Sequence, residues 1–148
     1  MKQIHRTALV PYPAAQMFEL VNDIESYPKF LPWCRSASRR QRDGGEVEAT
    51  IELAKGRVHK SFTTRNRIKP FESIEMHLLD GPFRHLQGEW RFREFEGLGC
   101  KISLELEFDF SSRTLAALVG PVFSHIANSL VESFCKRADQ LYARGKPA

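Results

Sequence analysis

The spacing of hydrophobic residues changes near residue 110, and this change limits the folds that the chain can adopt. From residue 34 to about residue 110, hydrophobic and polar residues alternate in short runs, as in strands with one buried face. The most regular run has Ile102, Leu104 and Phe108 separated by polar or charged residues. From Leu115 to Tyr142, apolar residues recur every three or four positions, as in an amphipathic helix. The sequence therefore predicts a sheet followed by one long helix.

Glycine and proline separate the alternating runs, and no helical pattern lies between them. These turn signals are Gly44-Gly45, Gly56, Pro70, Gly81-Pro82 and Gly97 with Gly99. Successive strands are therefore expected to pair as an antiparallel meander. Before the meander, residues 3–10 predict one more strand, residues 13–24 a short helix, and residues 27–33 a kinked helical stretch or loop. The predicted fold class is α+β, with about seven strands.

The long helix is expected to cover the apolar face of the twisted sheet. At 1.5 Å per residue it would be about 45 Å long, enough to cross the whole sheet. Ser111 or Ser112 is expected to cap its start. Pro121 cannot donate a hydrogen bond to the carbonyl of Ala117, so we predict a kink or break there. A curved sheet and a single helix leave space between them, which predicts a ligand cavity.

Side chains on the inward rows are the candidate walls of this cavity. The apolar candidates are Phe62, Leu86, Trp90, Phe92, Leu104, Phe108, Val119, Phe123 and Ile126. A small inward row on the second strand, Cys34, Ser36 and Ser38, is expected to leave volume unfilled. Thr64 and Asn66 in the inward row either hydrogen-bond a ligand oxygen or face water through a shift of register. Lys60 either meets the polar head of a ligand or reaches water at the edge of the sheet.

Basic residues are concentrated in two acid-free runs, within a chain of net charge +4. The runs span residues 33–42 and 53–71, and the glutamates of residues 46–52 lie on the strand expected between them. Arg39, Arg40, Arg65 and Arg67 therefore either pair with these glutamates or present a basic face to ribosomal RNA or anionic lipid. DNA is not an expected partner.

The reactive side chains form no catalytic or metal-binding pattern. The three cysteines include no C-x-x-C pair, and the five histidines include no H-x-x-x-H spacing. We therefore expect a protein without enzymatic activity, catalytic residues, metal or catalytic cofactor. The first residues do not resemble a signal peptide, and no run approaches the roughly 20 apolar residues of a membrane span. A cytoplasmic location is expected, with peripheral contact at the inner membrane as an addition.

Three motifs resemble those of the coenzyme Q-binding START-like family, within the polyketide cyclase/dehydrase superfamily. They are Tyr27-Pro28-Lys29-Phe30-Leu31-Pro32-Trp33, Ser61-Phe62-Thr63-Thr64-Arg65-Asn66, and Asp80-Gly81-Pro82-Phe83-Arg84-His85-Leu86 followed by Trp90. The resemblance spans almost the whole chain. It implies a single helix-grip (START/Bet v 1-like) domain over residues 1–148, with two short helices after the first strand.

The same resemblance implies two activities, which the sequence does not separate. One is the binding of ubiquinone or a related isoprenoid lipid in the cavity, in support of respiratory electron transport. The other belongs to bacterial members that are ribosome association toxins, which bind the large ribosomal subunit and block subunit joining. We take lipid binding as the main prediction and the ribosomal role as the alternative. Polyketide cyclases in the wider superfamily suggest an enzyme by analogy alone.

Overall fold

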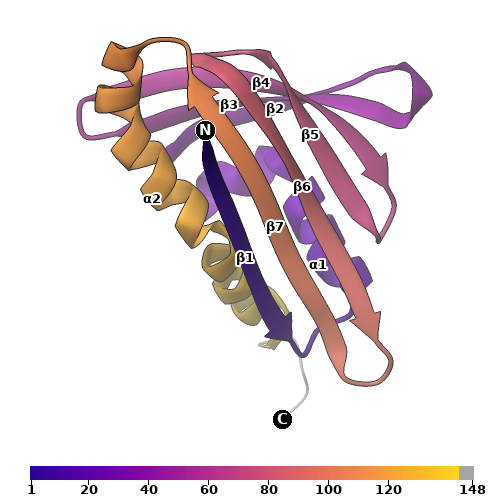
Figure 1. Ribbon diagram of the computed structural model, residues 1–148. Coiled ribbons are helices and arrows are strands. Elements are labelled where there is room, and N and C mark those ends of the chain that lie inside the picture. Colours follow the sequence, from indigo (N-terminus) through magenta and orange to yellow (C-terminus); the bar gives the residue numbers. More distant parts are fainter. Residues whose placement is uncertain (144–148) are drawn as a thin grey trace.

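The computed structural model describes residues 1–143 and confirms a seven-stranded antiparallel sheet wrapped around a long helix (Figure 1). The strands are β1 (Lys2–Val10), β2 (Cys34–Gln41), β3 (Glu46–Lys55), β4 (Val58–Lys69), β5 (Ser73–Asp80), β6 (Phe83–Phe95) and β7 (Gly99–Phe110). Their order across the sheet is β1-β7-β6-β5-β4-β3-β2. The predicted meander is therefore confirmed from β2 to β7, and β1 pairs with β7 at the opposite edge.

The helices follow the predicted positions. They are α1 (Ala14–Asn22), the 3-10 helices η1 (Ile24–Lys29) and η2 (Asp43–Gly45), α2 (Arg113–Ala138) and the π-helical turn η3 (Asp139–Ala143). Ser112 caps α2, because its hydroxyl accepts a hydrogen bond of 3.1 Å from the Leu115 amide. The break predicted at Pro121 is wrong, since α2 continues through it. Pro121 lies on the exposed side of the helix, and Ala117 is exposed as well, so water can hydrate the unpaired carbonyl.

The core lies between the concave face of the sheet and α2, with α1 and η1 on the same side (Figure 1). One part of it is a group of phenylalanines, which we call the phenylalanine cluster: Phe62, Phe83, Phe108, Phe110 and Phe123. The other part gathers under α1 and η1, where Met17, Trp90 and Phe134 are buried. The alternation along the strands therefore identified the buried face correctly.

A β-bulge near the start of β2 changes which of its residues face inward. The pairing with β3 shifts between Cys34 and Ser36. As a result, Ser36 and Ser38 are exposed, and the Ser36 hydroxyl donates a 2.9 Å hydrogen bond to the Glu52 carboxylate on the outer face. The prediction of one small inward row from Cys34 to Ser38 is therefore wrong, since strict alternation does not survive the bulge.

Candidate ligand cavity and charged faces

A small cavity of about 90 Å³ lies between the sheet and α2. The predicted wall residues that line it are Phe62, Thr64, Leu86, Trp90, Leu104, Phe123 and Ile126. Pockets that hold small ligands usually measure roughly 300–1,000 Å³. The interior is therefore mostly filled by side chains.

Four of the predicted cavity residues lie away from its wall. Phe92 packs edge-on against Phe18 of α1, with ring centroids 5.7 Å apart. Phe108 and Val119 are buried in and beside the phenylalanine cluster. Lys60 lies opposite the buried Leu53 and so shares the inner face, yet its side chain is exposed. A lone ammonium is costly in an apolar interior, so Lys60 reaches water at the margin of the sheet.

Several wall residues were not among the predicted ones, because elements distant in sequence bring them to the cavity. Val21, Ile24, Tyr27 and Trp33 reach it from α1, η1 and the start of β2. The Tyr27 hydroxyl donates a hydrogen bond to the carbonyl of Val21, which fixes η1 against α1. Burial raises the pKa of Tyr27 well above its ordinary value, so the phenol stays neutral. The Tyr27–Trp33 motif was the available signal for this wall, although it was linked to the family and not to the cavity.

One pair of polar side chains interrupts the apolar wall. Thr64 and Asn66 on β4 are only 6% and 4% exposed. The Thr64 hydroxyl donates a 2.7 Å hydrogen bond to Oδ1 of Asn66. Within residues 1–143 the Asn66 side chain makes no other hydrogen bond, so its amide nitrogen on the cavity wall lacks a protein partner. Such a donor suits a water molecule or the carbonyl oxygen of a ligand.

The buried thiols are poorly suited to covalent chemistry. Burial raises the pKa of both Cys34 and Cys100 to about 11, so little of the reactive thiolate is present near neutral pH. Burial also raises the pKa of Cys135. No group of three or more His, Cys, Asp or Glu side chains among the described residues is arranged to hold a metal ion. The cavity therefore offers binding surface and hydrogen bonds.

The outer face of β2, β3 and β4 is basic but largely ion-paired. Arg65 and Arg67 both lie 3.8 Å from the Glu46 carboxylate, so the predicted cross-strand pairing is confirmed for them. Arg42 pairs with Glu48 at 2.7 Å, and Arg35 with Glu52 at 4.0 Å. With Arg40 and Lys69, this face holds five arginines, one lysine and three glutamates, a net charge of 6 − 3 = +3.

The four arginines predicted to form one surface lie on two faces of the sheet. Arg40, Arg65 and Arg67 are on the outer face. Arg39 is turned inward by the bulge in β2, and its guanidinium Nη1 donates a 3.5 Å hydrogen bond to the carbonyl of Asn22 in α1. The expectation of a single four-arginine surface is therefore wrong for Arg39.

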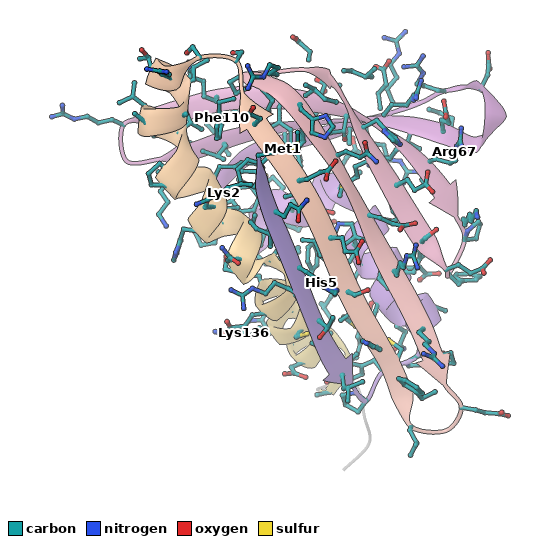
Figure 2. All side chains as sticks on the ribbon, in the orientation of Figure 1. Met1, Lys2, His5, Arg67, Phe110 and Lys136 are labelled. Carbon is teal, nitrogen blue, oxygen red and sulfur yellow. The ribbon has the colours of Figure 1, made fainter. Side chains whose placement is uncertain are left out.

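The outer face of β5, β6 and β7 is acidic and hollowed. Figure 2 views this side, with His5 and Arg67 at opposite margins of the strands in front. An open hollow of about 670 Å³ is lined there by four glutamates, Glu75, Glu89, Glu105 and Glu107, along with His5 and His77. Gly88 lies at its floor, where an added Cβ would be 2.7 Å from Cδ1 of Leu106. The outer face is therefore divided into a basic half and an acidic half.

Comparison with known proteins places this architecture in a family. Residues 10–135 match the family described as polyketide cyclase / dehydrase and lipid transport. The chain belongs to this family. Ribosome association toxin RatA of Pseudomonas aeruginosa is 45% identical over 139 residues, which cover 94% of this chain and 96% of the relative. The mitochondrial coenzyme Q-binding protein COQ10 of Dictyostelium discoideum is 29% identical, over 92% of this chain and 68% of that protein.

Solved structures that superpose on this chain confirm the helix-grip fold. A START superfamily protein from Mycobacterium smegmatis superposes with a TM-score of 0.76 at 16% identity, covering 94% of this chain and 98% of that one. The Zhui aromatase/cyclase of a Streptomyces species gives a TM-score of 0.78 at 17% identity, covering 99% of both chains. At such identities the likeness concerns the fold alone. The relatives by sequence are named as toxins or binding proteins, whereas some relatives by fold are cyclases.

Proposed function

We propose that this protein associates with ribosomes, which was the alternative to our main prediction. The observation that carries the proposal is the 45% identity, along nearly the full length of both chains, to a relative named ribosome association toxin. The coenzyme Q-binding relative is more distant, at 29% identity. The small cavity also favours ribosome association over quinone binding, because a cavity of about 90 Å³ must widen before it admits an isoprenoid quinone. In this proposal the protein acts in the cytoplasm, on the large subunit, and blocks subunit joining.

The proposed contact surface is the basic outer face of β2, β3 and β4. Its net charge of 6 − 3 = +3 attracts RNA phosphates, and the exposed Arg40 has no ion-pair partner within residues 1–143. Arg65 and Arg67 share the single carboxylate of Glu46, which leaves hydrogen-bond donors available on both guanidinium groups. The glutamates of the acidic half repel phosphate, so the RNA is expected to lie over one half of the outer face only.

Sedimentation with purified ribosomal subunits tests this proposal. The protein should co-sediment with the large subunit at low salt and dissociate as salt rises. Exchange of Arg40, Arg65 and Arg67 for glutamate should weaken binding. The slope of the logarithm of the binding constant against the logarithm of salt concentration should also become shallower by about one for each lost phosphate contact. Arg91→Glu is the matched control, because Arg91 is an exposed, ion-paired arginine on the outer face of the other half.

Two results would count against the proposal at different levels. Failure of the unaltered protein to bind either subunit at low salt would remove the ribosomal role. Binding that survives the triple exchange, or that Arg91→Glu weakens equally, would remove the proposed surface and leave the ribosomal role in place. A lower yield of joined ribosomes on addition of the protein to separated subunits would support the block of subunit joining.

Binding of a lipid remains a second candidate, which the Thr64–Asn66 pair favours. Asn66 lines the cavity, and its amide nitrogen has no hydrogen-bond partner within residues 1–143, so it can donate to a ligand carbonyl or to water. The proposed ligand is ubiquinone or a related isoprenoid lipid, with its ring carbonyl on Asn66 and the aromatic walls around it. Trp33 and Trp90 line the cavity, so ubiquinone analogues should quench their fluorescence saturably. A flat titration of delipidated protein would exclude this candidate.

A further inference from the structure

The first half of α2 presents a hydrophobic surface to solvent. The helix contains no charged residue between Arg113 and Glu132. By length and composition alone, Arg113–Ala143 is apolar enough to cross a membrane, yet only 28% of its most apolar window is buried. The buried side packs on the sheet through Val119 and Phe123, so α2 is the core helix of the fold. Much of its remaining apolar surface faces outward.

This outward surface, which we call the α2 patch, consists of Leu115, Ala117, Leu118, Pro121 and Val122. Leu118 is 64% exposed and forms the centre of the patch with the exposed Ala117 and Pro121, whereas Leu115 and Val122 are half-buried and also pack against the phenylalanine cluster. Residues three and four positions apart lie on one side of a helix, so the members of the patch are neighbours. Contiguous exposed apolar surface of this kind usually marks a contact with a partner or a membrane.

Two lysines lie on strands that contact α2. On β1, Lys2 shares the inward row with the buried Ile4 and lies beside α2 (Figure 2). On β4, Lys60 shares its face with Phe62, whose ring lies 6.0 Å from that of Phe123 in α2. Neither lysine forms an ion pair with any residue of the described range 1–143. Both ammonium groups are therefore available to an anionic partner.

Three further cations, with these two lysines, form the group that we call the cationic border. Lys55 and Arg57 lie at the β3–β4 turn, and Arg113 is the first residue of α2. None of the three makes an ion pair within the part of the chain that the structure describes. The sequence has no acidic residue in 53–71 or in 113–131, so no carboxylate of these segments competes for the cations. Arg65 and Arg67, in contrast, share a glutamate.

We propose that the α2 patch and its cationic border dock on a bilayer that contains anionic lipids. Side chains such as Leu118 would enter the interface, while Lys2, Lys60 and their neighbours contact the lipid phosphates. A second copy of the chain is a poorer partner, because its own cationic border would be placed against the first. RNA is a poorer partner as well, since the α2 patch offers neither aromatic rings for stacking nor hydrogen-bond donors for bases.

Co-sedimentation with vesicles tests the proposal. The protein should bind vesicles of phosphatidylcholine mixed with phosphatidylglycerol, release them at high salt, and bind pure phosphatidylcholine vesicles weakly. Leu118→Glu should abolish binding, because it places a carboxylate at the centre of the patch. Leu98→Glu is the matched control, since Leu98 is 81% exposed at the β6–β7 turn, remote in the fold from the start of α2. Lys60→Ala should weaken binding about fivefold, whereas Lys101→Ala should not.

Each outcome supports or contradicts docking of the α2 patch on an anionic bilayer. Equal binding to neutral and anionic vesicles, or equal loss in Leu118→Glu and Leu98→Glu, overturns the proposal. A dimer that Leu118→Glu dissociates, without vesicle binding by the unaltered protein, assigns the α2 patch to a second copy instead. Loss of ribosome binding in Leu118→Glu without vesicle binding assigns it to the ribosome. Leu118→Ser, which adds no charge, should weaken vesicle binding partially, and unchanged tryptophan fluorescence would show that both variants fold.

Discussion

The middle of the phenylalanine cluster and the region where the two parts of the core meet differ in how completely side chains fill them. In the phenylalanine cluster, Phe83, Phe108 and Phe123 contact one another, with ring centroids 4.8–6.4 Å apart. Beside it, the region around Thr64, Asn66 and Trp90 contains a cavity of about 90 Å³. Both regions come from the same alternating strands and the same helix. Alternation therefore predicts which side of a strand is buried, but not whether the buried volume is full.

The difference depends on the shapes of the facing side chains. Rings that meet edge-on fill space efficiently, as Phe108 and Phe123 do at an interplanar angle of 74°. In the other region, Ala49 lies beside Thr64 on the neighbouring strand, Asn66 follows on β4, and Ala127 lines the cavity from α2, so short side chains leave part of the space unfilled. The cavity thus lies where the sequence has small or polar residues on the inward rows.

The largest effect is expected from removing a ring of the phenylalanine cluster. Phe108 is almost fully buried, so Phe108→Ala should lower the free energy of unfolding by about 3–5 kcal/mol in urea denaturation. Phe95→Ala is the control at the end of β6, where the ring is half-buried and contacts the Arg93 guanidinium. Its loss should stay below about 1 kcal/mol. A loss at Phe108 as small as that would contradict the close packing of this region.

A second pair of variants compares the cavity with a fully packed position, through valine substitutions in α2. Ala127 and Ala138 are both buried on this helix, but only Ala127 lines the cavity. Ala138 is the last residue of α2, where the helix propensity cost of valine is no larger than at Ala127, so a greater loss at Ala138 reports the available space. Ala138→Val should lower the free energy of unfolding by about 1–3 kcal/mol through overpacking, and Ala127→Val by less than about 1 kcal/mol. Equal losses would mean that the cavity offers no room.

Much of the fold could be predicted from the sequence, because the evidence for it is local. The change of period near residue 110, the turn residues and the Ser112 cap each depend on residues close together in the chain. The two exceptions are also local features of the backbone, but the residue types at these positions do not predict them. The bulge in β2 places the side chains of Ser36 and Ser38 on the outer face of the sheet instead of the inner face. The helix α2 continues through Pro121, on a side of the helix that is open to water.

The candidate site was less predictable, because it depends on contacts between distant segments. Phe62, Trp90 and Ile126 were predicted to line the cavity and do so, whereas Tyr27 and Trp33 were not predicted. The charged surfaces show the same limit. In the acid-free run 53–71, Arg65 and Arg67 form ion pairs with Glu46 of the neighbouring strand. Lys60 of the same run forms no ion pair with any described residue. Charge runs give the number of cations, but tertiary structure decides which of them remain available.

The smallest expected effect concerns the polar pair on the cavity wall. Asn66→Leu leaves the buried Thr64 hydroxyl without its acceptor, and Thr64→Val leaves Oδ1 of Asn66 without its donor. The double variant removes both groups, so it should be more stable than the sum of the two single losses predicts, by about 0.5–1.5 kcal/mol.

The hydrogen bond between the half-buried Thr50 and Thr63 hydroxyls, at 2.9 Å, is the control pair. Water can replace its partners, so the same double-mutant cycle there should give a smaller coupling. Equal coupling at both sites would mean that water reaches Thr64 and Asn66 as freely as the outer face, and that the cavity is an open cleft.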